Sequence, residues 1–157
     1  MAAYDTYANA DTYFATRLHV LAWTESTTPD KTKALTEASA RIDRLRFKGV
    51  KVLEAQSLDW PRYLTSDDQD DDAQTATPTD IKIACYEIAF ALLDGVDPEM
   101  EFENLAVSSQ GFSSVRNTYA RGDAPEHIAA GIPSAFAWRF LKPWLTVGNV
   151  TKLSRVS

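Results

Sequence analysis

Cysteine is nearly absent from this chain of 157 residues, in which Cys85 stands alone. A single thiol excludes an internal disulfide and a thiolate-rich metal site. The neighbours Ile81, Ala84 and Ile88 place apolar side chains around Cys85 at helical spacing. This setting favours a small core residue over a reactive thiol.

Catalytic signatures are also lacking. The two histidines, His19 and His127, fall in a predicted helix and in a polar loop, and no HxxxH, HExxH or CxxC pattern occurs. The serines before Gln110-Gly111 do not match a GxSxG nucleophile turn, and the six glycines are too scattered for a phosphate loop. The alternating glutamates at positions 99, 101 and 103 are typical of a solvated surface rather than of an acid–base pair. We therefore predict a protein that is not an enzyme and binds no metal or cofactor.

Long hydrophobic runs are missing too. The apolar run at residues 88–93 is far shorter than the roughly 20 residues that cross a bilayer. Residues 1–5 have neither the positive charge nor the apolar core of a signal peptide. We expect a chain without a membrane span that stays in the cytoplasm where it is made.

Positive charge is in short supply. Lys and Arg number 16 against 22 Asp and Glu, for a net charge of -6. A protein that binds nucleic acid through a broad surface needs the opposite balance, so any DNA contact must be local. The length and the 45% hydrophobic content predict one globular domain.

Apolar residues at spacings of three and four predict helices in the first half of the chain. Residues 9–23 form one such pattern, which includes Leu18 and Leu21, with Asn9 or Asp11 as the cap. A second pattern runs from residue 29 or 30 to residue 48, and Gly49 would end that helix.

The next segment, residues 50–63, predicts an ordered but irregular connection. Pro61 biases Trp60 toward an extended backbone, and we expect the Trp60 side chain to pack onto the helices. Residues 64–77 follow as an acidic loop with five aspartates among residues 67–72. This loop lacks the glycine and the final glutamate of an EF-hand, so a solvated, mobile loop is favoured over a calcium site.

The second half of the chain predicts two more helices around a β-hairpin. A helix from residue 79 or 80 to residue 93 has an apolar face wide enough for the central helix of the fold. Residues 102–119 favour a hairpin of two strands, 102–108 and 114–119. A loop or single helical turn is expected at residues 120–131, and a final helix at residues 132–143.

Together these patterns predict a mainly α fold: a small bundle of about four helices with a short β-hairpin and an extended C-terminal tail. Residues 1–144 form the domain, and residues 145–157 form the tail. The tail contains no acid, and four apolar residues recur in it at intervals of three. We therefore predict a partner-binding segment, which consists of Trp144, Leu145, Val147, Val150, Lys152, Leu153, Arg155 and Val156.

One local surplus of positive charge follows the second predicted helix. Six cations face three carboxylates between residues 30 and 48. One interpretation is a solvated helix face. The other is a surface turned toward DNA or an acidic partner, made by Arg41, Arg44, Arg46, Lys48 and Lys51.

The order of these features resembles a known family. The residues that carry the resemblance are the run at 10–18, Arg41-Ile42-Asp43, Phe47-Lys48-Gly49, the helix at 84–91, residues 132–145 and, most specifically, Gln56-Ser57-Leu58-Asp59-Trp60-Pro61-Arg62. The chain is similar over residues 4–145 to phage proteins labelled DnaT-like single-stranded-DNA-binding proteins, which are in turn similar to head-to-tail connector adaptors. The acidic loop departs from that pattern.

For adaptors the resemblance implies a homo-oligomeric ring, commonly of twelve copies, in the neck of the virion. The ring would dock beneath the portal protein, contact a tail terminator or stopper protein, and let DNA pass through its lumen without sequence-specific contact. A terminal extension, most often C-terminal, would grip the portal. The label read literally implies instead a single-stranded-DNA-binding protein that acts in replication and uses the basic surface with stacked aromatic rings.

Overall fold

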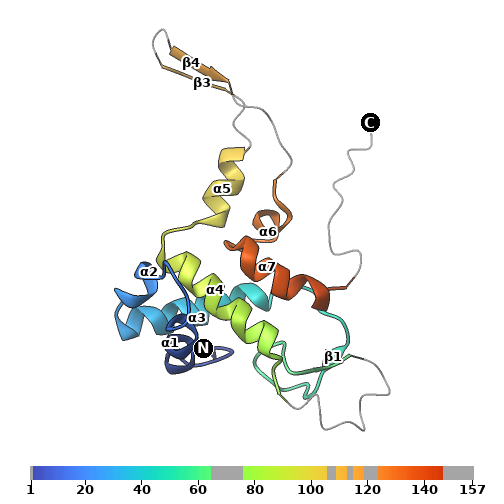
Figure 1. Ribbon diagram of the computed structural model, residues 1–157. Coiled ribbons are helices and arrows are strands. Elements are labelled where there is room, and N and C mark those ends of the chain that lie inside the picture. The colour runs from blue at the N-terminus through green and yellow to red at the C-terminus, as the bar shows by residue number, and fades with distance from the viewer. Residues whose placement is uncertain (1, 65–75, 106–108, 113–114, 119–123, 147–157) are drawn as a thin grey trace, which may run out of the picture.

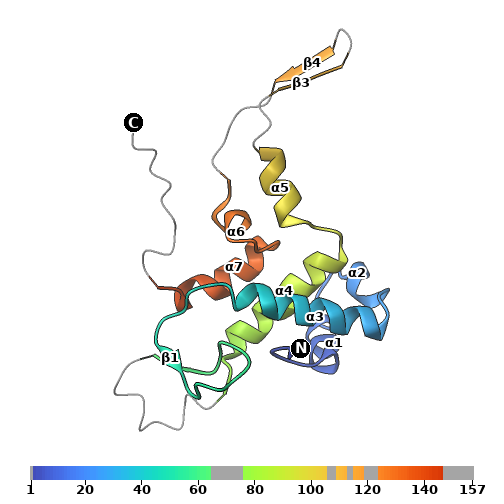
Figure 2. The same cartoon turned by 180° about the vertical axis from the view of Figure 1, so that it is seen from behind.

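A computed structural model of the chain describes residues 2–64, 76–105, 109–112, 115–118 and 124–146. Figures 1 and 2 show a helical body with one helix and a β-hairpin extending from it. Helices dominate the described residues, and the predicted mainly α class with a short hairpin is confirmed. The acidic loop, apart from residues 64, 76 and 77, and the tail from residue 147 lie outside the described residues.

Helix α4, Thr79–Leu93, forms the centre of the core. Ile81, Ala84, Cys85, Ile88 and Ala89 are fully buried in it. The helix packs against two others, α3 (Thr28–Ile42) and α7 (Ala135–Leu141), so apolar residues are needed around most of its circumference. The prediction of a central helix with these bounds is confirmed.

Helix α3, Thr28–Ile42, starts with the Thr27 hydroxyl accepting a hydrogen bond from the Asp30 amide. It ends six residues before the predicted end at Lys48. Beyond Ile42 the chain turns so that Phe47 becomes buried and pairs with Leu145 in an isolated β-bridge. Gly49 has a positive φ of 75° next to strand β1, so it is not the cap of this helix.

The single helix predicted for residues 9–23 is wrong, because the structure has two helices there. Helix α1, Tyr7–Phe14, is capped by Thr6 rather than by Asn9 or Asp11. Helix α2, Leu21–Thr24, follows a break in which His19 has a φ of 60°. The break folds the chain back so that the rings of Phe14 and Trp23 lie 4.7 Å apart.

The connection after α3 is irregular, as predicted, apart from one short antiparallel pair. Strand β1, Val50–Lys51, pairs with strand β2, Arg62–Tyr63. Trp60 is 2% exposed, and its ring meets the edges of Phe47 and Trp144. The Trp60–Pro61 peptide bond is cis. The expectation that Trp60 packs into the helical body is confirmed.

Helix α5, Pro98–Leu105, shows that the strand predicted for residues 102–108 is wrong over residues 102–105, and residues 106–108 lie outside the described residues. The Asp97 carboxylate accepts hydrogen bonds from the amides of Glu99 and Met100, and this cap starts a helix where apolar and acidic residues alternate. The predicted hairpin is present but shorter, with strand β3, Ser109–Phe112, paired to strand β4, Val115–Thr118.

The last described elements return the chain to the core. Helix α6, Glu126–Ala129, is the single turn expected between residues 120 and 131. Helix α7, Ala135–Leu141, is capped by the Ser134 hydroxyl, so it starts slightly later than predicted. It continues into the 3-10 helix η3, Lys142–Trp144. The main-chain amide of Thr146 then donates to the Arg46 carbonyl at 3.0 Å, which fastens the end of η3 beside the turn after α3.

Candidate interaction surfaces

Arg41 does not lie with the other cations of the predicted basic surface. Its side chain is 13% exposed and points from α3 toward α5. One guanidinium nitrogen donates to Glu99 and to the Gly131 carbonyl, each at 2.8 Å, and the other donates to Glu37 at 3.2 Å. The bond to Glu99 is the main cause that raises the pKa of Arg41, and the same bond lowers the pKa of Glu99. Arg41 therefore holds the fold together.

The other four cations come from the turn after α3 and from β1. Arg44, Arg46 and Lys48 are exposed, and the Lys48 ammonium donates to the Pro143 carbonyl at 3.0 Å. Lys51 forms an ion pair with Asp59 at 3.2 Å. Two apolar side chains of the same segment face solvent, since Val50 is 60% exposed and Leu53 66%. We call this segment, residues 44–53, the basic segment.

Trp144 and Leu145, the first residues of the predicted portal-binding segment, pack onto the body. The Trp144 indole donates to Asp80 at 3.3 Å, and its ring lies 5.2 Å from that of Trp60. Leu145 packs against the core beside Phe47. The remaining six predicted contacts, Val147, Val150, Lys152, Leu153, Arg155 and Val156, lie outside the described residues.

Sequence reasoning missed several exposed apolar side chains. Leu18 and Leu21 were assigned to an apolar helix face, but they flank the break at His19 and are 82% and 68% exposed. The Arg17 guanidinium nearby stacks over the Phe136 ring at 4.8 Å. The helical spacing of the two leucines did not indicate their exposure. The break between them is marked by the backbone angle of His19, and the residue types around His19 do not reveal it.

A second exposed apolar group lies on α5. Met100 is 60% exposed, Phe102 49% and Leu105 38%. Three glutamates, Glu99, Glu101 and Glu103, alternate with them along the helix. The apolar residues from Phe102 onward lack a helical period in the sequence, so their signal predicted a strand instead of this helix. We call the helix with these six side chains the α5 surface.

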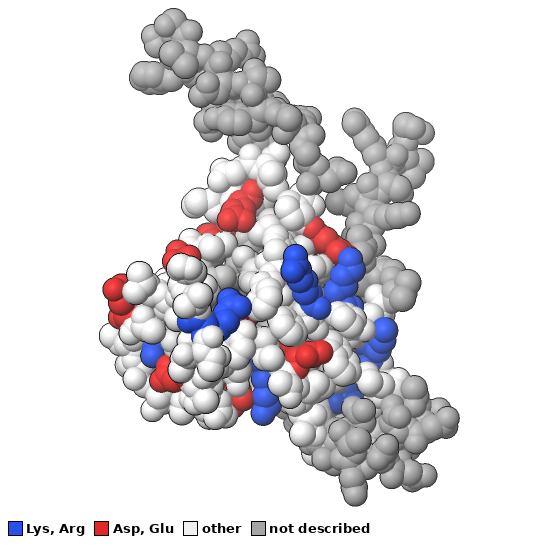
Figure 3. Space-filling model, viewed as in Figure 1, with Lys and Arg blue, Asp and Glu red and all other residues white. Residues whose placement is uncertain are grey.

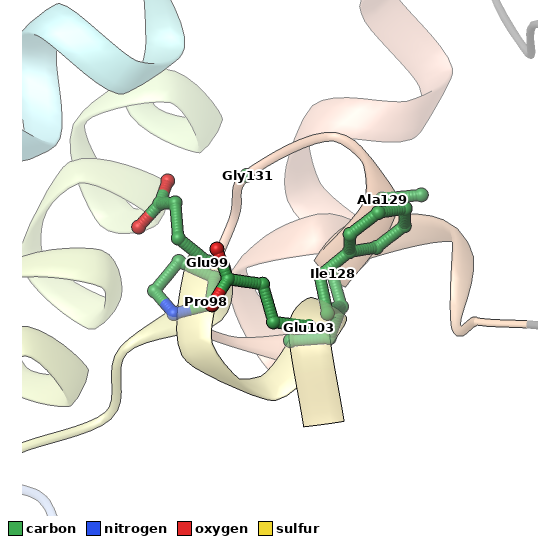
Figure 4. A pocket seen from close by; sticks show the side chains of 7 residues that line it. Pro98, Glu99, Glu103, Ile128, Ala129 and Gly131 are labelled. Carbon is green, nitrogen blue, oxygen red and sulfur yellow. The ribbon is translucent and has the colours of Figure 1, made fainter. Parts of the chain in front are cut away.

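A pocket of about 240 Å³ opens between α5 and α6. Figure 4 shows Glu99 and Glu103 of α5 beside Ile128 and Ala129 of α6, and the lining is completed by Pro98, Phe102 and Gly131. Two carboxylates beside an aromatic ring and aliphatic groups disfavour a phosphate and suit a cationic or apolar side chain.

Several titratable groups are buried or partly buried among the described residues. Cys85 is fully buried, which confirms it as a core residue, and this burial raises the pKa of its thiol to about 12. Burial also lowers the pKa of His127. Glu87, 2% exposed, accepts a hydrogen bond from the Tyr13 hydroxyl at 2.7 Å and pairs with Arg17 at 3.2 Å. Within the residues that the structure describes, no group of three His, Cys, Asp or Glu could hold a metal ion, and no helix is long and apolar enough to cross a membrane.

Figure 3 shows carboxylates over α5 and cations over α7, with further groups of both signs elsewhere on this face. Helical packing and exposed apolar groups define a class: a small, mainly helical domain with exposed apolar side chains on several elements. The family model described as "Putative DnaT-like ssDNA binding protein" matches residues 1–156, and the chain belongs to this family. No curated protein and no solved structure gives a significant match.

Proposed function

We propose that this protein is a non-enzymatic structural subunit that acts by binding other proteins. The observation that carries the proposal is that exposed apolar side chains occur in three groups on different elements. These groups are Leu18 and Leu21 at the start of α2, Val50 and Leu53 in the basic segment, and the α5 surface. Large apolar side chains that are exposed in groups on one element are typical of protein interfaces. Three such groups on different elements suit a subunit with several neighbours.

The assembly that fits best is the neck of a tailed phage. There the protein would form a ring, expected to contain twelve copies, between the portal protein and the tail terminator or stopper. It would assemble in the host cytoplasm and remain in the virion. The acid-free segment after Thr146 would bind the portal, and the net charge of -6 would let DNA slide through the lumen without sequence-specific contact.

Binding of single-stranded DNA is the second candidate, and the family description favours it. Arg44, Arg46 and Lys48 provide exposed cations, which phosphate binding requires. Arg41 and Lys51 are paired with carboxylates, so part of the predicted surface is neutralised within the chain. Exposed aromatic rings for base stacking occur at Tyr7, Phe102 and Phe136, on three elements that are far from one another in the sequence.

One pair of measurements separates the two functions. The full chain is incubated with the portal protein encoded by the same genome, and complexes are isolated by size. A matched chain that ends at Thr146 keeps the core, because Trp144 and Leu145 are retained. We expect the full chain to bind portal and the shortened chain to lose that binding. Equal binding by both chains would contradict the role of residues 147–157.

In the second measurement, a fluorescent oligonucleotide is titrated with the full chain at several salt concentrations. The adaptor function predicts no binding at physiological ionic strength, since the protein carries excess negative charge. Binding that weakens with salt and is lost in Arg44→Ala with Arg46→Ala would support the DNA-binding function instead. Salt-dependent DNA binding together with no portal binding by the full chain would overturn the adaptor proposal.

A further inference from the structure

We propose that copies of this chain associate head to tail, with the α5 surface of one copy docked on the basic segment of the next. The inference rests on the proposed ring and names the two surfaces that would build it. Its evidence is the unsatisfied packing of α5, the charge that α5 presents, and the complementary residues at the other end of the body.

Helix α5 has too little packing for its composition. It has eight residues, and a helix this short gains little stability from its own hydrogen bonds. Within the described residues it packs chiefly against the single turn α6. Met100, Phe102 and Leu105 remain exposed, and the pocket at its base stays open between Phe102 and Ile128. A partner that covered this helix would bury all three side chains and fill the pocket.

The charge on α5 selects the partner. Glu99 is already paired with Arg41 of the same chain at 2.8 Å. Glu101 and Glu103 form no ion pair with any described Lys or Arg, and both are exposed. A partner surface that is apolar and carries cations would satisfy the helix. A second acidic surface would be repelled.

The basic segment has this chemistry. Val50 and Leu53 supply exposed apolar groups, and Arg44 and Lys48 supply exposed cations that pair with no described carboxylate. Figures 1 and 2, which are turned by 180° about the vertical axis, both place α5 at the top of the body and β1 at the bottom. The two surfaces therefore lie at opposite ends of one copy.

Opposite ends are what a repeating contact needs. In a head-to-tail contact, one surface of each copy binds a different surface of the next copy. A pair of copies then still has one free surface of each kind, so the contact repeats in one direction. The series closes into a ring if the rotation between neighbouring copies allows it. A contact of this kind leaves Leu18, Leu21 and the segment after Thr146 available for the other partners of a neck.

The test uses two full-length variants with reversed charge. In the first, Glu101→Lys with Glu103→Lys makes α5 cationic; in the second, Arg44→Glu with Lys48→Glu makes the basic segment acidic. Sedimentation equilibrium measures self-association of each at concentrations up to roughly 1 mM, the weak limit of specific binding. Each variant should associate at least about tenfold more weakly than the unaltered chain. Circular dichroism checks that both remain folded.

Mixing the two variants gives the sharper result. The cationic α5 of one variant then meets the acidic segment of the other, and the remaining pair of surfaces also matches, so association should return in the equimolar mixture. The controls Glu25→Lys and Lys33→Glu each reverse one charge, of the same sign as in the corresponding variant, at an exposed position outside both surfaces. They should associate like the unaltered chain.

Three results would overturn the inference: an unaltered chain that stays monomeric, variants that associate as strongly as the unaltered chain, or a mixture that stays monomeric. Loss of association in the α5 variant and on reversal of Lys152 and Arg155, with the basic-segment variant unaffected, would overturn the inference and assign α5 to the C-terminal segment instead. Portal binding by the full chain is measured separately. If the chain binds portal in any of these cases, the proposed function stands and only the head-to-tail inference fails.

Discussion

Asp43, the residue that follows α3, connects three parts of the chain. Its carboxylate accepts hydrogen bonds from the Tyr4 hydroxyl and, at 3.2 Å, from the Asp59 amide. Burial raises the pKa of Asp43. The N-terminal segment, the end of α3 and the connection before Trp60 therefore meet at one partly buried carboxylate. These contacts explain why α3 stops at Ile42 although the apolar pattern continues to Leu45.

Two glycines with similar backbone angles give a prediction at this scale. Gly49 has a φ of 75°, and a β-carbon there would lie 1.8 Å from the Tyr63 carbonyl oxygen. Gly95 has a φ of 87°, but a β-carbon would meet nothing within 4 Å. Gly95→Ala should therefore cost about 1 kcal/mol for the left-handed backbone alone. Gly49→Ala should cost more than about 2 kcal/mol, because β1 and β2 must also separate.

Urea unfolding followed by circular dichroism measures both costs. Each glycine serves as the control for the other, because the backbone penalty is shared and the contact with Tyr63 is not. Equal losses of stability in the two variants would show that the approach of Gly49 to β2 contributes nothing.

Helix α5 illustrates the scale of elements, since one side chain of α3 fastens it. Arg41 bridges Glu99 of α5 and the Gly131 carbonyl before α7. Lysine at this position keeps the charge but loses the planar fork that reaches both partners. Arg41→Lys should lower the free energy of unfolding by about 1 kcal/mol. It should also speed amide hydrogen exchange in residues 101–105 more than in α4.

A matched variant, Lys33→Arg, alters an exposed cation of the same helix, and neither measurement should change. An unchanged rate of amide exchange in α5 of Arg41→Lys would contradict this prediction. It would mean that contacts with α6, and not Arg41, hold α5 in place.

The sequence predicts elements well where local signals agree with tertiary packing. Helix α4 combines an entry at Pro78, a continuous apolar pattern and a stop at Gly95, so its bounds could be predicted. The start of α5 depends on the Asp97 cap, which the sequence contains, but the apolar residues after Met100 show no helical period and favoured a strand. The break at His19 is required by the burial of Phe14 and Trp23 together, which helical spacing does not reveal.

The candidate surfaces could be predicted only in part for the same reason. The exposed cations Arg44, Arg46 and Lys48 were found from their charge. The partner of Arg41 lies 58 residues away in the sequence, so local pattern could not show that this arginine is neutralised. The apolar character of α5 was visible, but its exposure depends on how little of the body lies against it.

At the scale of the whole molecule, protons are held more tightly in the folded state at several buried hydroxyl and thiol groups. Burial is the main cause that raises the pKa of Tyr4, Tyr13 and Tyr86, and bonds to Asp43, Glu87 and Asp5 add to it. Burial raises the pKa of Cys85 to about 12. The ordinary values are 10.0 for tyrosine and 9.0 for cysteine.

These shifts predict that the protein loses stability in alkali. Above pH 9 the unfolded chain releases protons from these groups while the folded chain retains them, so the unfolded state gains free energy of ionisation and the free energy of unfolding falls as pH rises. The urea midpoint should be constant near pH 8 and should decrease steadily between about pH 9 and pH 11. In Tyr13→Phe the decrease should be shallower, because one of the four groups no longer ionises on unfolding. A midpoint that stays constant up to pH 11 would mean that these hydroxyls ionise as readily in the folded protein as in the unfolded chain.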